Sequence, residues 1–321
     1  MGERKRLYYL DVLRVIACIM VIIIHVSSDY IYIGESIAGN SYIVGLVANT
    51  MSRSCIGLFL MISGALVLKK STSLSNVVKH SIKYLYLYFL WSFFYSLVSI
   101  VYMGDYSVEN IVGSMLRGKY HLWYLLLISF IYGIIPLFKS IDVKSLKWVC
   151  FICILFGVVF PSLNFGDWSL FENVVNSKIL AYIGYFILGY LLSRARGSFI
   201  FILPLVVVWV FHSDMMIRLC RRDGVFNEYL SDYNNILVFI EVVCIFLIVK
   251  YMVTKGNRVV ELISGASFGI YLVHVVFVDA FRNFELFEKL PVLVAALLIF
   301  VASFGVSWLI GLVKPIKWLI F

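Results

Sequence analysis

Residues 11–26 read DVLRVIACIMVIIIHV, an apolar run interrupted by three ionisable side chains, Asp11, Arg14 and His25. Together with its apolar flanks, this run is long enough to cross a bilayer as a helix. Arg14 and His25 are eleven residues apart in the chain. At 100° per residue, their side chains point within about 20° of each other and lie roughly 16 Å apart along the axis. The stretch therefore predicts a membrane helix with an arginine and a histidine on one face.

The whole chain has the composition of an integral membrane protein. Of its 321 residues, 62% are hydrophobic and 14% are charged, and the mean hydropathy is +0.98, whereas a soluble domain is about a quarter charged. The apolar runs exceed the ~10 residues of a barrel strand and do not alternate with polar residues. Most of the six cysteines lie inside these runs, and we interpret them as small apolar residues, so we expect no metal site. The predicted fold class is an all-α, polytopic bundle.

Hydropathy predicts ten membrane-spanning helices. An even number places both termini on one side of the membrane, and the concentration of Lys and Arg in alternate loops marks that side as the cytoplasm. The net charge of +9 reflects this orientation, so it does not indicate a nucleic-acid partner. We expect one transmembrane domain over residues 1–321, and no internal repeat of the kind found in many transporters. The predicted spans are 7–27, 42–68, 82–103, 120–138, 146–163, 177–192, 197–212, 234–252, 261–282 and 290–313.

The second predicted span repeats the pattern of the first, because RSCIGLFLMISGALVL (residues 53–68) begins with Arg53 at membrane depth. A buried arginine costs several kcal/mol by insertion scales, so Arg14 and Arg53 each need an anionic partner or a polar cavity. Asp11, three residues before Arg14, can supply a structural ion pair. An anionic ligand that relieves the repulsion between the two arginines is the other interpretation.

Four motifs in chain order resemble those of the acyltransferase family 3 membrane proteins, and the resemblance covers essentially the whole chain. They are the family's Arg-x10-His pattern, its arginine followed by a Phe-Phe-x-x-Ser-Gly-like stretch, its His/Leu-Trp-Phe/Tyr-Leu element and its Ser-x-Gly-x-Tyr-Leu-x-His element. The matching residues are Arg14 and His25; Arg53, Phe59, Ser63 and Gly64; His121, Trp123 and Tyr124; and Ser267, Gly269, Tyr271 and His274.

The resemblance implies a membrane O-acetyltransferase of the bacterial cytoplasmic membrane. Such an enzyme takes an acyl group, most commonly acetyl, from cytoplasmic acetyl-CoA. It delivers the group to a hydroxyl of a cell-envelope carbohydrate or lipid-linked sugar that is reached from the outer side. The implied partners are therefore the acyl-CoA donor, the sugar acceptor and the lipid bilayer.

Within that resemblance, His25 is the expected general base, because imidazole titrates near neutrality. Glu241, which lies at a similar depth in its own span, is the expected carboxylate that orients it, and a structural pairing of Glu241 with Arg53 is the alternative. Arg14 and Arg53 are expected to hold the donor or the oxyanion of the transition state.

The remaining candidate residues have supporting roles. Lys83 and Ser63 are assigned to the donor side, although ordinary positive-inside charge also explains Lys83. His121 and Trp123 are assigned to the acceptor side, with the aromatic belt as the alternative for Trp123. The residues assigned to support the site are Asp11, Tyr271 and His274, of which the last two also suit helix–helix hydrogen bonding.

A carrier is the second function that the sequence allows. Some members of the resembled family, such as the membrane domain of serine racemases linked to vancomycin resistance, are thought to move a small amino acid. An arginine-lined cavity would bind the carboxylate of an amino acid as readily as a CoA phosphate. The presence of His25 favours transfer, because a carrier needs no general base.

Overall fold

The structure, a computed structural model, describes residues 6–32, 39–69, 74–103, 113, 115–163 and 178–313. Throughout these ranges every regular element is a helix and none is a strand. The all-helical class predicted from composition is therefore confirmed.

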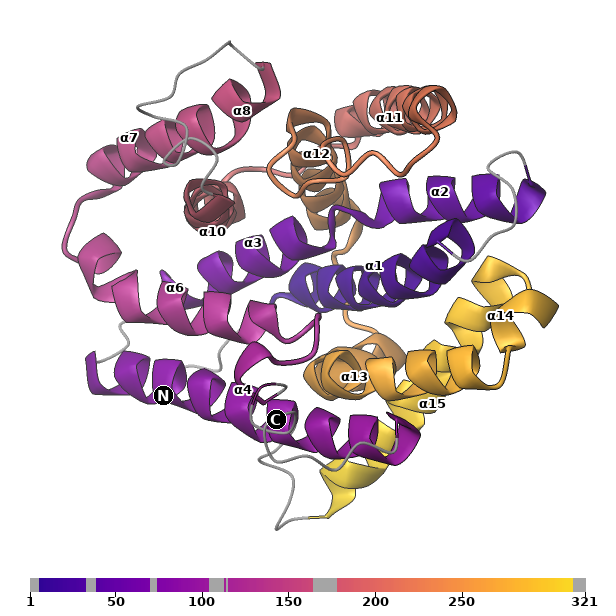
Figure 1. The fold of residues 1–321 in the computed structure, drawn as a ribbon. Helices are drawn as coiled ribbons and strands as arrows, with labels where there is room; N and C mark the ends of the chain where they lie inside the picture. The colour runs from indigo at the N-terminus through magenta and orange to yellow at the C-terminus, as the bar shows by residue number, and fades with distance from the viewer. Residues whose placement is uncertain are drawn as a thin grey trace. The chain divides into compact units, whose positions relative to one another are not determined.

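The chain forms two compact units, Met1–Leu66 with Lys147–Phe321, and Val67–Leu146 (Figure 1). The smaller unit contains α4 (Leu74–Met103), which packs against α6 (Trp123–Lys139). The larger unit contains α1 (Tyr8–Tyr32), α2 (Asn40–Ser52), α3 (Cys55–Val67), most of α7 (Val143–Ile154), η1 (Leu155–Val159), α8 (Phe160–Leu163), α10 (Lys178–Arg194), η2 (Phe199–Phe201), α11 (Ile202–Asp223), α12 (Ile236–Met252), α13 (Arg258–Asn283), α14 (Leu286–Lys289) and α15 (Val292–Leu312).

Helix α1 is the centre of the larger unit, where it packs against α2, α12, α13 and α15. In Figure 1 it lies between α3 on one side and α13 on the other. Helices α1 and α13 run parallel, because successive residues of one meet successive residues of the other. Their contacts, in order, are Asp11 with Ser264, His25 with His274, and Asp29 with Arg282.

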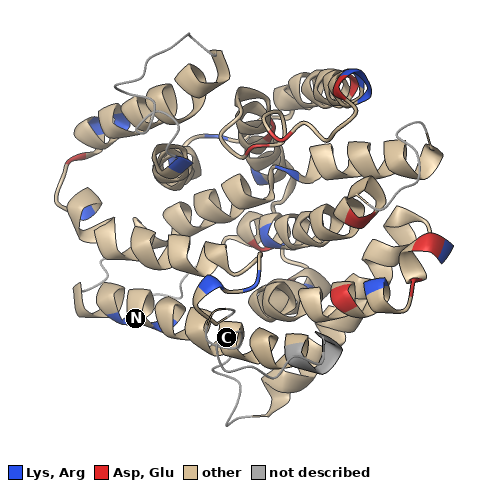
Figure 2. Ribbon diagram, viewed as in Figure 1, with Lys and Arg blue, Asp and Glu red and all other residues tan. Residues whose placement is uncertain are grey.

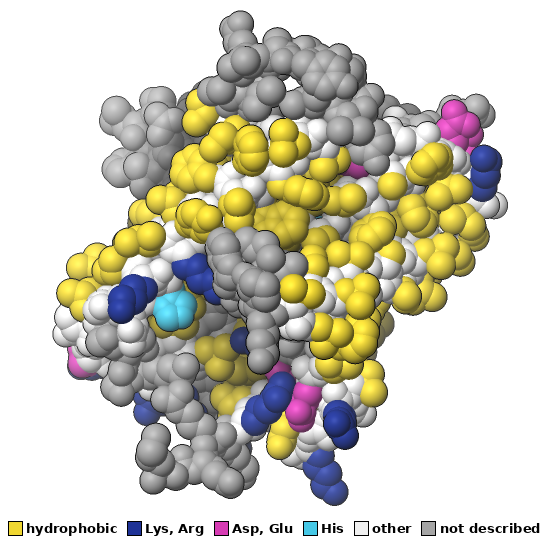
Figure 3. All heavy atoms as spheres, turned by 90° about the horizontal axis from the view of Figure 1, so that it is seen from below, with side chains coloured by type: hydrophobic (Ala, Val, Ile, Leu, Met, Phe, Trp, Pro, Cys, Tyr) yellow, Lys and Arg dark blue, Asp and Glu magenta, His cyan; other side chains and the backbone are white. Residues whose placement is uncertain are grey.

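Within the described residues, six helical stretches are long and apolar enough to cross a membrane. Each of the ten predicted ranges falls on a helix, while the number ten and the side of the termini stay predictions. Hydrophobic side chains cover much of the surface seen in Figure 3, and most of the ribbon in Figure 2 carries no charged residue. The six stretches are Tyr8–Tyr32, Asn40–Val67, Val143–Leu163, Phe199–Asp223, Arg258–Asn283 and Val292–Leu312.

The second predicted span contains a break that the sequence analysis does not anticipate. Helix α2 ends at Ser52 and α3 begins at Cys55, so Arg53 and Ser54 form a turn inside an apolar stretch. The Arg53 amide bonds to the Thr50 carbonyl at 3.2 Å, three residues back instead of the four of an α-helix. Irregular backbone at membrane depth is tolerated where it is buried in protein or lines a cavity.

Helix α11 continues to Asp223, eleven residues beyond the predicted end at 212. Its polar second half is supported by an ion pair between Asp214 and Arg218, one turn apart at 2.9 Å. Gly224 then ends the helix with φ of 71° and donates its amide to the Cys220 carbonyl at 2.9 Å. The predicted end at 212 is wrong because the change to polar residues there does not end the helix, whereas the left-handed Gly224 does.

Two glycines hold α3 directly against α10. A Cβ atom on Gly64 would lie 1.7 Å from the Phe186 carbonyl oxygen, and one on Gly189 would lie 2.0 Å from the Met61 carbonyl oxygen. No larger residue fits at either position without moving a backbone. This close approach fixes the helix that follows Arg53.

Candidate active site

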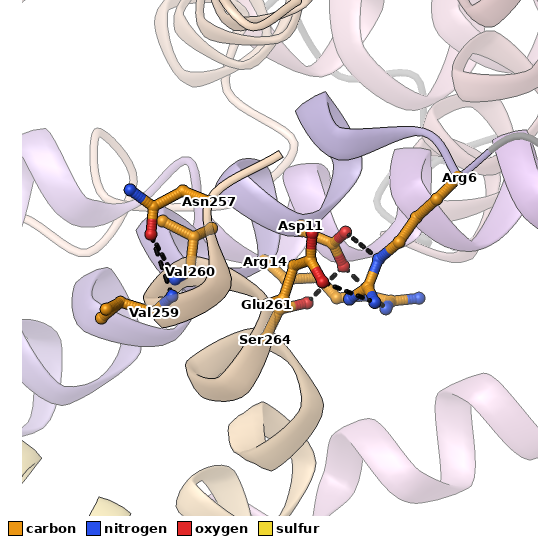
Figure 4. A network of polar contacts seen from close by, with 8 residues as sticks. All are labelled: Arg6, Asp11, Arg14, Asn257, Val259, Val260, Glu261 and Ser264. Atoms are coloured by element: carbon orange, nitrogen blue, oxygen red, sulfur yellow. Dashed lines mark hydrogen bonds and ion pairs between the residues drawn. The ribbon is translucent and has the colours of Figure 1, made fainter. Parts of the chain in front are cut away.

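Five side chains meet where α1 and α13 begin, and we call them the Asp11 network (Figure 4). Asp11 accepts a hydrogen bond from the Ser264 hydroxyl at one oxygen and from Arg6 Nε at the other, both at 2.7 Å. Arg6 also reaches Glu261, with Nη1 3.1 Å from Oε2. Arg14 Nη1 lies 3.9 Å from Asp11 Oδ1. Two arginines thus face two carboxylates, and the charges balance.

The predicted pair between Asp11 and Arg14 exists, but it is the longest contact in the network. Asp11 is bound more closely by Arg6, whose guanidinium pKa is raised by that hydrogen bond. Arg14 keeps 34% of its side chain exposed. Arg6 is not among the predicted site residues, because it precedes α1 and no helical spacing links it to Asp11.

His25 and His274 lie side by side on α1 and α13, with ring centroids 5.2 Å apart and planes inclined by 33°. His274 is fully buried, and its Nδ1 lies 2.7 Å from the Tyr271 carbonyl oxygen. Because a carbonyl only accepts hydrogen bonds, Nδ1 carries the proton. The structure therefore brings three predicted residues together, with His274 between the other two. Their catalytic and supporting roles stay predictions.

Arg53 is tied to α1 beside His25 through an asparagine. Arg53 Nε and Nη2 both donate to Asn49 Oδ1, at 2.9 and 2.6 Å. Asn49 Nδ2 in turn donates to the Ile24 carbonyl at 3.2 Å and to Ser27 Oγ at 2.9 Å. The sequence analysis missed Asn49, although an asparagine one helical turn before a membrane arginine is a recognisable signal.

The other contacts of the Arg53 guanidinium are aromatic. Its carbon lies 5.6 Å from the centroid of the Phe226 ring and 5.9 Å from that of Tyr233. We call Asn49, Phe226 and Tyr233 together with Arg53 the Arg53 cage. Over the described part of the chain, no carboxylate lies within ion-pair distance of this guanidinium, so the alternative pairing with Glu241 is not formed.

Glu241 instead belongs to a polar cluster inside the larger unit. Its two oxygens bond to His212 Nδ1 at 2.8 Å and to the Ser54 hydroxyl at 3.0 Å, and His212 Nε2 lies 3.0 Å from the Leu230 carbonyl oxygen. All three of these side chains are fully buried. The sequence analysis did not select His212 or Ser54, because no local pattern connects them to Glu241. Both oxygens of Glu241 are thus bound by residues other than His25, its expected partner, and the catalytic role of Glu241 stays a prediction.

A second ion cluster joins the carboxyl-terminal ends of α1 and α13. Arg282 binds both oxygens of Asp29, at 2.7 and 3.1 Å, and Asp279 at 3.1 Å. Asp29 is buried, and its two-fold contact with the guanidinium is the strongest ion-pair geometry. The cluster holds the two helices together near the histidine pair.

The remaining predicted residues lie apart along the chain. Ser63 donates its hydroxyl to the Phe59 carbonyl of its own helix at 2.9 Å. Lys83 lies on α4 and Trp123 is the first residue of α6, both in the smaller unit. His121, in the same unit, is buried with its ring edge-on to Tyr95 at 5.1 Å. Their donor and acceptor roles stay predictions.

An apolar groove of about 550 Å³ runs along the opposite face of α1. Its lining includes Ile16 and Ile23, which are each two residues from Arg14 or His25 and so point away from them. Trp209 and Leu293 close it from α11 and α15. In the described residues, no cluster of three or more His, Cys, Asp and Glu side chains has the arrangement of a metal site.

Helices of this length and apolarity, with a polar site between them, define a multi-pass membrane protein. A family model described as an acyltransferase domain, that of the acyltransferase 3 family, matches residues 7–312. The chain therefore belongs to this family, and it is a membrane acyltransferase. No curated protein and no solved structure matched the chain.

Proposed function

We propose that the protein transfers an acetyl group from cytoplasmic acetyl-CoA to a hydroxyl of a cell-envelope carbohydrate or lipid-linked sugar at the bacterial cytoplasmic membrane. The observation that carries the proposal is the arrangement along α1. One end of this helix holds Arg14 in the Asp11 network, and the same face holds His25 against His274 roughly three turns further on. A donor and an acceptor approaching from opposite sides of the membrane can meet along such a face.

In the proposed reaction, Arg14 holds an anionic part of the donor, and His25 acts as general base. His25 accepts the proton of the acceptor hydroxyl as the hydroxyl oxygen attacks the thioester carbonyl. The carbon–sulfur bond breaks, and the leaving CoA thiolate receives the proton from His25. The step needs no further reactant, because the proton lost by the acceptor is the one gained by the thiol.

Two assays with radiolabelled acetyl-CoA test the proposal. Binding is measured on purified protein in nanodiscs, and transfer is measured on membranes as label that appears in the envelope fraction. We expect His25→Ala to bind acetyl-CoA and to lose transfer by about 10²-fold or more, and Arg14→Gln to lose binding. Arg218→Gln is the control, because Arg218 is an exposed cation of α11. Transfer that survives His25→Ala, or folded wild type that binds no acetyl-CoA, would overturn the proposal and turn attention to transport of a small anion.

A further inference from the structure

The Arg53 cage differs from the two other arginine clusters described above, the Asp11 network and the cluster around Arg282. Arg6, Arg14 and Arg282 each have at least one carboxylate within 4 Å, whereas the partners of Arg53 are an amide and two aromatic rings. A cation at membrane depth is costly unless its charge is compensated. A positive charge that has no carboxylate partner among the described residues is suited to a ligand anion.

The cage holds the guanidinium in a fixed position without using up its donors. An arginine has five N–H groups in a planar fork, and Asn49 accepts two of them at a single oxygen. Asn49 is itself fixed by two hydrogen bonds to α1. A planar fork of this kind matches two oxygens of a phosphate or a carboxylate.

Tyr233 adds a neutral donor beside the guanidinium. Burial raises the pKa of the Tyr233 hydroxyl, and the neighbouring Arg53, which is also hydrogen-bonded to it, offsets only part of that effect. The hydroxyl therefore stays protonated near neutral pH. A neutral hydroxyl at this place does not compete with an anion for the positive charge of Arg53.

The position of the cage favours binding of the acceptor over binding of the donor. Arg53 lies in the break between α2 and α3, and it is close enough to His25 to interact with it electrostatically. Two members of the cage come from the connection between α11 and α12, which the orientation analysis predicts on the outer side. Arg14 and the Asp11 network lie at the other end of α1.

We propose that Arg53 binds an anionic group of the acyl acceptor, a phosphate or carboxylate oxyanion, and so holds the acceptor hydroxyl beside His25. The inference rests on the proposed function, and it moves Arg53 from the donor side, where the sequence analysis placed it, to the acceptor side. It narrows the acceptor class to anionic sugars, such as a sugar phosphate or a uronic acid.

Thermal stabilisation of the purified protein in a neutral detergent tests this assignment, with methyl phosphate, acetate and coenzyme A as three separate probes. We expect methyl phosphate or acetate to stabilise wild type and Arg14→Gln, with an apparent affinity about tenfold or more lower for Arg53→Gln. Coenzyme A should show the reverse pattern, stabilising Arg53→Gln but not Arg14→Gln. The stronger of the two small anions identifies the group as phosphate or carboxylate.

A second variant keeps the test valid if Arg53→Gln does not fold. Phe226 lies in the connection between α11 and α12, outside the helices. In Phe226→Glu, a carboxylate next to the guanidinium should abolish stabilisation by the small anions. Phe226→Leu, which adds no charge, should retain this stabilisation. Equal stabilisation of Arg53→Gln and wild type, or no stabilisation of wild type by either anion, overturns the inference. Stabilisation of wild type by the anions but not by coenzyme A leaves the Arg53 site standing and contradicts the proposed donor.

Discussion

Arg14 and Arg53 are both arginines within membrane-spanning stretches, and their surroundings are opposite. Arg14 belongs to a network in which two carboxylates balance two guanidinium groups. Arg53 is held by the Asn49 amide and by two ring faces. An arginine in a membrane-spanning stretch therefore does not have one role: Arg14 contributes to a charge-balanced helix junction, whereas no described carboxylate compensates the charge of Arg53.

No carboxylate of the described residues pairs with Arg53, although an acidic side chain lies nearby. Glu241 binds Ser54, the residue that directly follows Arg53, and its other oxygen binds His212. An arrangement that gave Glu241 to Arg53 would leave His212 without its partner in the interior. The pairing is thus selective: Glu241 serves His212 and Ser54, and Arg53 keeps neutral neighbours among the described residues.

The largest effect is expected for Glu241→Leu. The change leaves His212 and Ser54 without a partner in a fully buried position, and breaking a buried pair costs about 3–5 kcal/mol. Glu241→Gln is the matched control, because its amide oxygen still accepts from Ser54 and its amide nitrogen can donate to His212. Chemical unfolding in detergent measures both, and equal losses of stability would show that the charge of Glu241, rather than its hydrogen bonding, stabilises the cluster.

Asp11→Asn is expected to have the next largest effect. It removes one of the two carboxylates of the network and leaves Arg6 and Arg14 facing a neutral amide. We expect a loss of about 2 kcal/mol, less than for a fully buried pair because Arg6 is 47% exposed. Glu261→Gln, which removes the more exposed carboxylate, should cost less in the same unfolding measurement. The reverse order would place the centre of the network at Glu261.

Gly64→Ala tests the packing that fixes α3 behind the Arg53 cage. The new methyl group would meet the Phe186 carbonyl, and overpacking of this kind costs about 1–3 kcal/mol. Gly265→Ala on α13 is the control, since a Cβ there meets no atom within 4 Å, so it should be neutral or slightly stabilising. If Gly64→Ala left both stability and anion binding unchanged, α3 would be free to shift without disturbing the cage.

Much of the fold follows from the sequence because hydropathy and length are local properties. The face shared by Arg14 and His25 follows in the same way from helical periodicity, and so does the weak pair between Asp11 and Arg14. The break after Ser52 does not, because no proline or glycine stands at it, and the polar residues around it (NTMSRS, residues 49–54) do not by themselves end a helix. The Asn49–Arg53 contact is partly predictable: its one-turn spacing is visible in the sequence, but the hydrogen bonds from Asn49 to α1 are not.

The rest of the site depends on residues that are distant in the chain. Ser264 reaches Asp11 from α13, and His212 reaches Glu241 from α11. No spacing rule connects such pairs, because the helices that carry them meet only in the folded bundle. The sequence suggests His25 or, alternatively, Arg53 as the neighbour of Glu241, and in the structure its two oxygens bond to His212 and Ser54 instead.

The smallest effect is expected for Arg14→Gln and Arg53→Gln without ligand, and the sign of the stability change distinguishes the two arginines. Removing Arg14 takes away a long, partly exposed ion pair, so a loss of up to about 1 kcal/mol is expected. Removing Arg53 takes away a charge that no described carboxylate compensates. The unliganded variant should therefore be as stable as wild type or more stable by about 0.5 kcal/mol, because a functional residue is often kept at a cost in stability. Side-by-side thermal unfolding in the same detergent measures both variants. A marked loss in Arg53→Gln would mean that the cage stabilises the bundle, and that the two arginines differ less than their partners suggest.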